Sequence, residues 1–542
     1  MKPKTLLSGN EAIALGAYEA GCRIGTGYPG TPSTEILEHF ITFRDAYAEW
    51  SVNEKTAVET AIGVSLGGKR ALAVMKHVGV NVAADPIFTA SYIGVNGGLV
   101  IVTADDPGMH SSQNEQDNRN YALAAKIPML EPSDSQEARD YTKLAFDLSE
   151  KYDTPVFIRS VTRLSHSKTL VSTPDTKNTA DTPSRTAYKS TRFKRDIKKY
   201  VMIPGNARPR RVELEKRLLK LFKACNTLPI NTMETPNKKL GFITSGVTYQ
   251  YVKESFPHAS ILKLGMVYPL PFKLIKEFCS QIQTVFIVEE LDPYLETQIR
   301  AQGITNIHGK DTFPSIGEFN PQIIKQSLAS AQCLNAVHSP TKALETSHSP
   351  LPIPNRPPEL CKGCPHRSIF QILKDLNITV SGDIGCYSLG ALPPFESMHT
   401  LVDMGASITV AQGLELAGKP SVAVIGDSTF AHSGITGLLN AAYNKRNTLI
   451  IILDNHTTAM TGMQPNPLTG ETLMGEPAFE LDYIKLGEAV GIKKSNIKIV
   501  NAFKKEAVQK ALVDLLDSKK LSLLILQGPC LIYHKKKMKM AS

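Results

Sequence analysis

Short apolar runs alternate along the chain with stretches whose apolar positions repeat at helical spacing. The strand-like runs near the N-terminus are "RALAVM", "GGLVIVTAD" and "TPVFIR", and those near the C-terminus are "SVAVIGD", "TLIIILDN" and "LSLLILQG". Between them lie "KLGFITSG", "SILKLGMVYPL" and "TVFIVEE", and a helical pattern covers "SQEARDYTKLAFDLSEKY". This alternation predicts an α/β protein built on parallel sheets.

The same pattern divides the chain into three α/β blocks, joined by polar segments. The predicted parts are 1–165, 166–237 (a basic linker), 238–335, 336–359 (a Pro-rich linker), 360–535 and 536–542 (a basic tail). Within the basic linker, "VELEKRLLKLFKA" has helical apolar spacing. A chain of 542 residues is long enough for several domains, which agrees with this division.

Charge and hydropathy restrict the location and the partners. No apolar run approaches the length of a membrane span, and the start "MKPKTLLSGNEAIALG" lacks the apolar core of a secretory signal. We therefore expect a cytoplasmic protein without a membrane partner. The net charge of +10 comes mainly from residues 185–223. This segment is predicted to be solvated, with a docking surface as the alternative and nucleic acid as a weaker one.

Polar residues close two strands of the last block. Asp427 ends "SVAVIGD" and Asn455 ends "TLIIILDN", so both are predicted to reach the ligand-binding edge of one sheet. Their oxygens are the hard ligands that Mg²⁺ prefers. Gly426 permits a tight turn, and the following helix offers free N–H groups to a diphosphate. Alone, Asp427 also fits a helix N-cap and Asn455 a turn.

Four of the eight cysteines are candidates for a metal or cluster site. A disulfide framework is not expected in a large chain without a secretory signal. Cys361 and Cys364 form a C-x-x-C pair, Cys386 lies in "GDIGC", and Cys530 follows the strand "LSLLILQG". These residues fit a 4Fe–4S cluster, a structural zinc site or two unrelated thiol pairs.

Gly426-Asp427-Ser428, followed after one helix by Asn455, resembles the thiamine diphosphate signature Gly-Asp-Gly with a distal Asn. Ser428 replaces the second glycine. More closely, the chain resembles the α subunits of indolepyruvate ferredoxin oxidoreductase, within the 2-oxoacid:ferredoxin oxidoreductases. The resembling segments span most of residues 5–530: "GYPGTPSTEI", "DDPGMHSSQNEQDNR", "MLEPSDSQEA", "CKGCPHR", "GDIGCYSLG", "GDSTFAHSGI" and "DNHTTAMTGMQPNP". The resemblance implies pyrimidine-binding and diphosphate-binding modules and a transketolase C-terminal-like domain.

The resemblance also implies roles for individual residues. Mg²⁺ would be held by Asp427, Asn455 and the carbonyl of Thr457. The remaining cofactor-lining residues would be Gly385, Tyr387, Gly426 and Ser428, and the cluster ligands would be Cys361, Cys364, Cys386 and Cys530. His456 stands where a smaller polar residue is expected, which would alter the lip of the pocket.

Five residues are predicted to act on the cofactor or the substrate. Glu54, at a strand-to-helix junction, would relay a proton to the cofactor's pyrimidine ring, although a helix N-terminal acid is the plain alternative. Thr31 would contact the 2-oxoacid. Arg119 would pair with its carboxylate, with an ordinary surface role as the alternative. His110 and His432 would be active-site histidines.

The resemblance implies oxidative decarboxylation of an aryl 2-oxoacid to an acyl-CoA, with electrons passed to ferredoxin. A separate small (beta) subunit and a dimer of large subunits are expected, because thiamine sites form between a pyrimidine block and a diphosphate block. The family's C-terminal ferredoxin-like domain, with repeated C-x-x-C-x-x-C motifs, is not found in these 542 residues. The electrons would then go to a separate protein, the chain would be truncated, or the activity would be altered. A non-oxidative decarboxylase or carboligase, and an idle scaffold subunit, are the alternatives.

Overall fold

The structure, a computed structural model, contains two compact units, Met1–Lys342 and Ala343–Ser542. The residues that it describes are 4–51, 53–66, 68–172, 197–200, 204–334, 359–401, 404–405, 407–408, 411, 421–443 and 445–535. The predicted basic tail, nearly all of the Pro-rich linker and residues 173–196 and 201–203 of the basic linker lie outside this set. In the part of the chain that the structure describes, every helix is too short or too polar to span a bilayer.

The first unit contains a seven-stranded sheet with the order β12-β6-β7-β5-β4-β2-β3. Its strands are β2 (Ile24–Gly27), β3 (Tyr47–Trp50), β4 (Ala71–Lys76), β5 (Leu99–Asp105), β6 (Met129–Leu130), β7 (Val156–Val161) and β12 (Met266–Tyr268). All neighbouring pairs are parallel except β12 with β6. The prediction of a parallel α/β sheet is confirmed.

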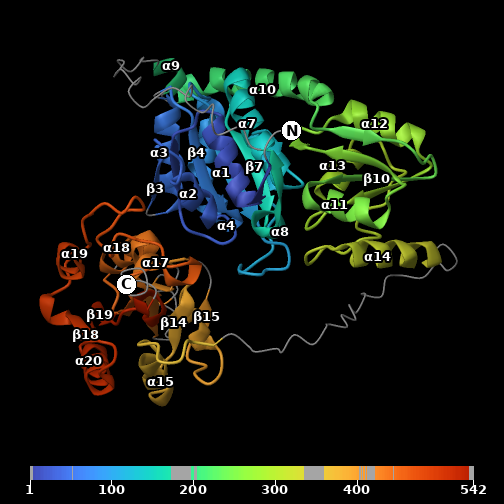
Figure 1. The fold of residues 1–542 in the computed structure, drawn as a ribbon. Coiled ribbons are helices and arrows are strands. Elements are labelled where there is room, and N and C mark those ends of the chain that lie inside the picture. Colours follow the sequence, from blue (N-terminus) through green and yellow to red (C-terminus); the bar gives the residue numbers. More distant parts are fainter. Residues whose placement is uncertain are drawn as a thin grey trace. The chain divides into compact units, whose positions relative to one another are not determined.

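Two groups of helices pack beside this sheet (Figure 1). One group is α1 (Gly9–Glu19), α2 (Thr34–Phe40) and α7 (Ser135–Tyr152), and the other is α3 (Glu54–Leu66), α4 (His77–Val82) and α5 (Ala84–Ile93). The helix α7 has the bounds that its apolar periodicity predicts, and the Asp134 side chain caps its first turn. Right-handed crossovers to strands on either side of β2 put the two groups on opposite faces of the sheet.

A second, four-stranded sheet of the order β13-β10-β11-β9 belongs to the same unit. Its strands are β9 (Thr232–Glu234), β10 (Leu240–Ser245), β11 (Ser260–Leu264) and β13 (Thr284–Val288), and its helices are α11 (Gly246–Ser255), α12 (Phe272–Gln281), α13 (Tyr294–Arg300) and α14 (Pro321–Leu334). The run "SILKLGMVYPL", predicted as one strand, is two. It breaks at Gly265, where a Cβ would lie 2.5 Å from the carbonyl oxygen of Ile230, and β12 then joins the first sheet.

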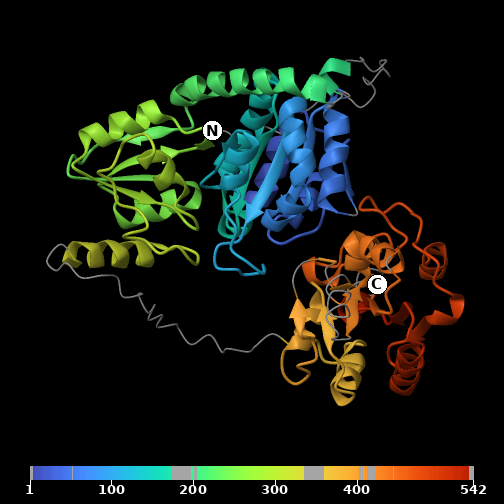
Figure 2. The same ribbon diagram turned by 180° about the vertical axis from the view of Figure 1, so that it is seen from behind.

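The described part of the basic linker, 166–237, packs within the first unit, whereas the sequence predicts its residues 185–223 to be solvated. It includes β8 (Lys168–Ser172), which pairs with β1 (Lys4–Ser8), and the long helix α10 (Pro204–Ala224), visible in Figures 1 and 2. Arg210 and Arg217 of α10 donate hydrogen bonds to carbonyl groups at the end of α5. Because the C-terminus of a helix attracts cations, this basic charge docks α10.

The second unit contains one parallel sheet of the order β15-β14-β16-β17-β19-β18. Its strands are β14 (Val380–Gly382), β15 (Thr400–Leu401), β16 (Val422–Gly426), β17 (Leu449–Asp454), β18 (Ile497–Asn501) and β19 (Ser522–Gln527). The main helices are α15 (Arg367–Asp375), α18 (Ile435–Tyr443), α19 (Tyr483–Ala489) and α20 (Lys505–Asp517). Two apolar cores, one including Val424 and Ile451 and the other Ile425 and Ile452, lie on either side of this sheet.

The six parallel strands of the first unit and the six of the second follow the same order. In each sheet, the first parallel strand lies between the second and the third, so the strands that follow it are added on opposite sides of it. Such a switch point opens a crevice at the carboxyl ends of the two central strands. These strands are β2 and β4 in the first unit, and β14 and β16 in the second.

Candidate active site

The crevice of the second unit is bordered by Asp427, which follows β16 directly and is buried. Its carboxylate accepts the backbone N–H groups of Ser428, at 2.8 Å, and Thr457, at 3.2 Å. The side-chain oxygen of Asn455 accepts the same Thr457 N–H at 3.1 Å. The three residues assigned to Mg²⁺ by resemblance are therefore in one hydrogen-bonded group.

The charge of this group fits a divalent cation. Burial, together with the neighbouring Asp454 carboxylate, raises the pKa of Asp427. Among the described residues, no lysine or arginine pairs with Asp427 or Asp454. Two buried carboxylates beside amide and carbonyl oxygens form the hard donor set that Mg²⁺ prefers. The residues present fit the ion.

Two glycines of the predicted cofactor loops give space to one aromatic ring. A Cβ on Gly426 would lie 2.6 Å from Cε1 of Tyr387, and one on Gly385 would lie 2.3 Å from the same atom. The Tyr387 hydroxyl donates to the carbonyl of Ile384 at 2.9 Å, and the Thr429 hydroxyl donates to the same carbonyl. The ring thus locks the "GDIGC" loop to the Gly-Asp-Ser turn.

Ser428, which departs from the thiamine signature, has a structural contact of its own. Its hydroxyl accepts a hydrogen bond from the Thr458 hydroxyl at 2.9 Å, which ties the turn after β16 to the loop after β17. His456 in that loop has a left-handed backbone, with φ of 56°. With Leu468, Glu471 and Tyr533, its side chain lines a cavity of about 340 Å³.

The four candidate cluster cysteines come together beside the metal group. The backbone N–H of Cys530 donates to the carbonyl of Asn455 at 3.3 Å. The C-x-x-C loop packs on the Cys530 turn, since a Cβ on Gly528 would lie 2.5 Å from Pro365. Burial and, after it, the charges of the other three thiols raise the pKa of Cys386 to about 11. The four thiols are therefore neighbours.

The chemistry of these four thiols fits the ligand set of a 4Fe–4S cluster. No three His, Cys, Asp or Glu side chains in the described ranges are grouped so as to hold one metal ion. In a 4Fe–4S cluster each thiolate binds a different iron, so the sulfur atoms stand further apart than around one ion. Four mutually close thiols at the open end of a sheet fit that donor set.

The first unit has its own crevice, between the loops that follow β2 and β4. Thr31 lies in the loop after β2, and its carbonyl accepts the Ser111 hydroxyl at 3.2 Å. Ser33, which precedes α2, makes no side-chain cap to this helix, and its hydroxyl donates instead to the carbonyl of Gly30. Thr31 is thus held at the switch point.

Glu54 begins α3 and is buried, as its position at a strand-to-helix junction predicts. Its side chain lies against the first turn of α4. A Cβ on Gly79 would be 2.6 Å from Cγ and 2.8 Å from Oε1 of Glu54. Only a glycine leaves this carboxylate its space, and a dry carboxylate is what a proton relay requires.

Lys76 is the residue at this crevice that the sequence interpretation missed. It is the last residue of β4, and its ammonium donates to the carbonyl of Ser111 at 3.1 Å. Burial lowers the pKa of Lys76 to about 8, against the opposing charges of Asp106 and Glu54. The signal was present in "ALAVMK", a polar residue that closes an apolar strand, as Asp427 does.

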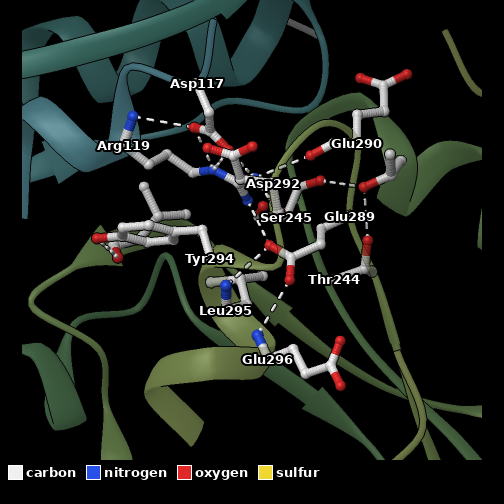
Figure 3. Close-up of polar contacts among 12 residues, drawn as sticks. Asp117, Arg119, Thr244, Ser245, Glu289, Glu290, Asp292, Tyr294, Leu295 and Glu296 are labelled. Atoms are coloured by element: carbon white, nitrogen blue, oxygen red, sulfur yellow. Dashed lines mark hydrogen bonds and ion pairs between the residues drawn. The ribbon is translucent and has the colours of Figure 1, made fainter. Parts of the chain in front are cut away.

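Arg119 has a different place from the one predicted. It is fully buried, and each of its three guanidinium nitrogens donates to protein acceptors (Figure 3). Nε bonds to Asp117 at 2.9 Å and Nη1 to Glu289 at 2.9 Å, while Nη2 bonds to Asp117 and to the carbonyl of Glu290. This ion-pair group joins the first sheet to β13, and it leaves Arg119 no exposed donor for a substrate carboxylate.

The two predicted histidines have contrasting surroundings. His110 is half exposed, and its Nε2 lies 3.2 Å from Glu318, which also pairs with Arg163. His432 is buried in a π-helical turn, Phe430–Gly434, where its Nδ1 bonds to the Ser433 hydroxyl. Such π turns are frequent at functional sites. The catalytic roles of His110 and His432 stay predictions.

Together, the fold and these crevices define a class, the thiamine diphosphate-dependent 2-oxoacid oxidoreductases. Residues 15–225 match the pyruvate flavodoxin/ferredoxin oxidoreductase family, thiamine diphosphate-binding domain. Residues 383–526 match the C-terminal thiamine pyrophosphate-binding domain of thiamine pyrophosphate enzymes. The second match begins in the "GDIGC" loop and ends in β19, so it contains the whole metal group.

Relatives over nearly the full chain define the family more closely. Indolepyruvate oxidoreductase subunit IorA of Archaeoglobus fulgidus is 40% identical, over 98% of this chain and 87% of that protein. The same subunit from Pyrococcus horikoshii is 39% identical, over 98% of this chain and 86% of that protein. The chain belongs to the indolepyruvate oxidoreductase subunit IorA family. A solved 2-oxoglutarate:ferredoxin oxidoreductase from Magnetococcus marinus aligns with 61% of this chain and 65% of that chain, at 16% identity and a TM-score of 0.49. That likeness is too distant to support a functional conclusion.

Proposed function

We propose that the chain decarboxylates an aryl 2-oxoacid oxidatively, transfers the acyl group to coenzyme A and passes the electrons through a 4Fe–4S cluster to ferredoxin. Indolepyruvate is the proposed substrate, because the relatives are named for it. The observation that carries the proposal is the hydrogen bond from Cys530 to Asn455. It sets a thiol-rich loop against the metal group, as an electron exit requires.

In this proposal, Asp427, Asn455 and the Thr457 carbonyl hold Mg²⁺, and the residues of the Gly-Asp-Ser turn face the diphosphate. Thiamine diphosphate, when bound, supplies a nucleophilic carbon and takes up the electrons left by CO₂. Glu54 holds the proton that the pyrimidine ring needs, a role typically worth about 10²–10⁴ in rate. Thr31 contacts the 2-oxoacid. His110 and His432 are proposed proton donors of the pocket.

The proposal also requires partners. A small (beta) subunit is expected to complete the enzyme, since the relatives are named as one subunit of an oxidoreductase. Ferredoxin would receive the electrons, coenzyme A would accept the acyl group, and two large subunits would form a dimer. We propose the cytoplasm as the location.

Anaerobic turnover of indolepyruvate with coenzyme A and a viologen dye tests the proposal, with and without a candidate small subunit. The Asp427→Ala variant should lose Mg²⁺ and thiamine diphosphate binding in calorimetry. Asp482→Ala is the matched control, because Asp482 is an exposed helix cap in the same unit. If Asp427→Ala keeps its activity, the metal group is misassigned.

Other outcomes separate the alternatives. Release of CO₂ without dye reduction would indicate a non-oxidative decarboxylase. No binding of thiamine diphosphate to the wild-type protein would indicate a scaffold subunit and would overturn the proposed function.

A further inference from the structure

Lys76 and Asp427 lie at the carboxyl ends of corresponding strands in the two units. The two sheets share one strand order, in which β4 corresponds to β16. Lys76 is the last residue of β4, and Asp427 immediately follows β16. Each therefore borders the crevice at its switch point, where ligands bind in open α/β sheets. In one unit that position has a carboxylate suited to a cation. In the other it has an ammonium group suited to an anion.

The surroundings of the Lys76 side chain support a ligand role. Its stem lies beside Gly30, where a Cβ would be 3.3 Å from Cγ and Cδ, and its Nζ bonds to the Ser111 carbonyl at 3.1 Å. The Ser111 hydroxyl in turn bonds to the Thr31 carbonyl. Lys76 thus lies between the loop of Thr31 and the loop of Ser111. Among the described residues, Ser111 is the one hydrogen-bond acceptor of this ammonium group.

Lys310 shows what a structural lysine looks like in the same unit. Burial lowers its pKa to about 8 as well, but its Nζ donates to two backbone carbonyls, those of Glu289 and Pro314. An ammonium group has three donors, and Lys76 is only partly buried, so donors that the protein leaves unused are open to a ligand. Lys76 has donors to spare where Lys310 has two of its three engaged.

We propose that Lys76 binds the carboxylate of the 2-oxoacid substrate at the switch point of the first sheet. This proposal rests on the proposed function. It makes Lys76, and not the buried Arg119, the ligand of the substrate carboxylate. Glu54 and Asp106 are the charged groups that act on Lys76, from α3 and from the loop after β5. Both are acidic, so without the ammonium group they would repel a substrate carboxylate.

The proposal predicts a separation of KM from kcat. The substrate carboxylate is charged before the reaction and leaves as neutral CO₂, so an ammonium group binds it best in the ground state. Interactions of this kind lower KM without raising kcat. Lys76→Met should therefore raise KM with little loss of kcat. Affinity should also decline as the pH rises past about 8, where Lys76 loses its proton, and Lys76→Arg should move that limb to higher pH.

The decisive experiment is equilibrium binding of two non-reacting probes, indole-3-propionate and indole-3-propionamide. The full chain with its small subunit, thiamine diphosphate and Mg²⁺ is titrated in a calorimeter. The wild type should prefer the acid by a factor on the order of 10 to 100, the value of a hydrogen bond to a charged group. Lys76→Met should bind both probes about equally, and Lys76→Arg should keep a preference for the acid. Lys310→Met, the matched control, should keep the wild-type preference.

The outcomes judge Lys76 and the proposed function separately. Turnover in the wild type, combined with an unchanged acid preference in Lys76→Met, overturns the role of Lys76 and leaves the function standing. An equal affinity of the wild type for the two probes also overturns it. Absence of turnover, combined with an acid preference that Lys76→Met abolishes, overturns the function and keeps the carboxylate site. If Lys76→Met does not fold, the comparison of Lys76→Arg with the wild type across pH 7 to about 9 decides.

Discussion

Replacement of Arg119 by methionine tests the structural role of the buried ion-pair group. Arg119 is 1% exposed, Asp117 is fully buried and Glu289 is 2% exposed. Removing the arginine leaves the buried Glu289 without its ion-pair partner, and it leaves Asp117 with only the more distant Arg159, at 3.9 Å. Breaking a buried pair in this way costs about 3–5 kcal/mol. Methionine retains much of the packing volume, so the loss should come from charge.

The size of this loss can be measured as a shift in Tm. The entropy of unfolding is about 2.1 cal/mol/K per residue, or roughly 0.7 kcal/mol/K for the first unit, Met1–Lys342. The expected decrease in Tm is therefore about 4–7 °C in differential scanning calorimetry. Lys253→Met is the control, because it breaks the Lys253–Glu234 pair, whose side chains are 36% and 46% exposed. That pair contributes at most about 1 kcal/mol, or roughly 1.5 °C.

Two further measurements sharpen the result. Adding Glu289→Gln to Arg119→Met removes one of the stranded charges and should recover part of the lost stability. The KM for the 2-oxoacid should stay within the range of the control. A normal Tm together with a large rise in KM would refute the structural role and restore Arg119 as a substrate ligand.

Three other predictions concern the same elements. Burial raises the pKa of Glu290 from 4.5 to about 7, so the folded state keeps a proton that the unfolded state loses, and the free energy of unfolding should decline by about 3 kcal/mol as the pH rises from 4.5 through 7. In urea unfolding, Glu290→Gln should flatten this pH dependence, and an equally steep curve in the variant would exclude Glu290 as its cause. Gly426→Ala places a Cβ 2.6 Å from Tyr387, which should cost about 1–3 kcal/mol of stability and weaken thiamine diphosphate binding. The control Gly491→Ala should keep the cofactor affinity, because Gly491, with φ of 89°, has no atom within 4 Å of the added Cβ, and equal affinities of the two variants in calorimetry would contradict this account. Cys530→Ser should weaken or abolish the visible absorption of the anaerobically purified protein, whereas the control Cys279→Ser, in α12 of the first unit, should leave this absorption unchanged. A cluster that persists in Cys530→Ser would require a different fourth ligand.

Local pattern was sufficient for the elements and for the prediction that Asp427 and Asn455 meet at one edge of a sheet. The helix α7 and the strands β16 and β17 follow directly from apolar periodicity, and Asp427 was found from the rule that polar residues closing parallel strands meet at one edge. Lys76 obeys that rule as well. The motif resemblance implies Arg119 as the carboxylate ligand, so the sequence alone does not single out Lys76.

Features that depend on distant contacts could not be read from local pattern. Arg119 sits in a polar segment that looks exposed, and its burial follows from Glu289 and Glu290, about 170 positions later. The break at Gly265 depends on the carbonyl of Ile230, which no periodicity reveals. The packing of α10 likewise depends on the carbonyl groups at the end of α5, a partner outside its own segment.

The strand β12 has a consequence for the order in which the protein forms on the ribosome. In the first sheet the strand β6, only two residues long, lies between β7 on one side and the edge strand β12 on the other. Residues 266–268 are synthesised more than a hundred positions after β7 is complete. Until they emerge, the nascent sheet presents an unpaired edge, the feature through which β proteins aggregate. A fragment cut at residue 237, between the first two predicted blocks, would keep that edge open permanently. A fragment that extends through Tyr268 would instead keep β6 paired on both sides, as in the full chain.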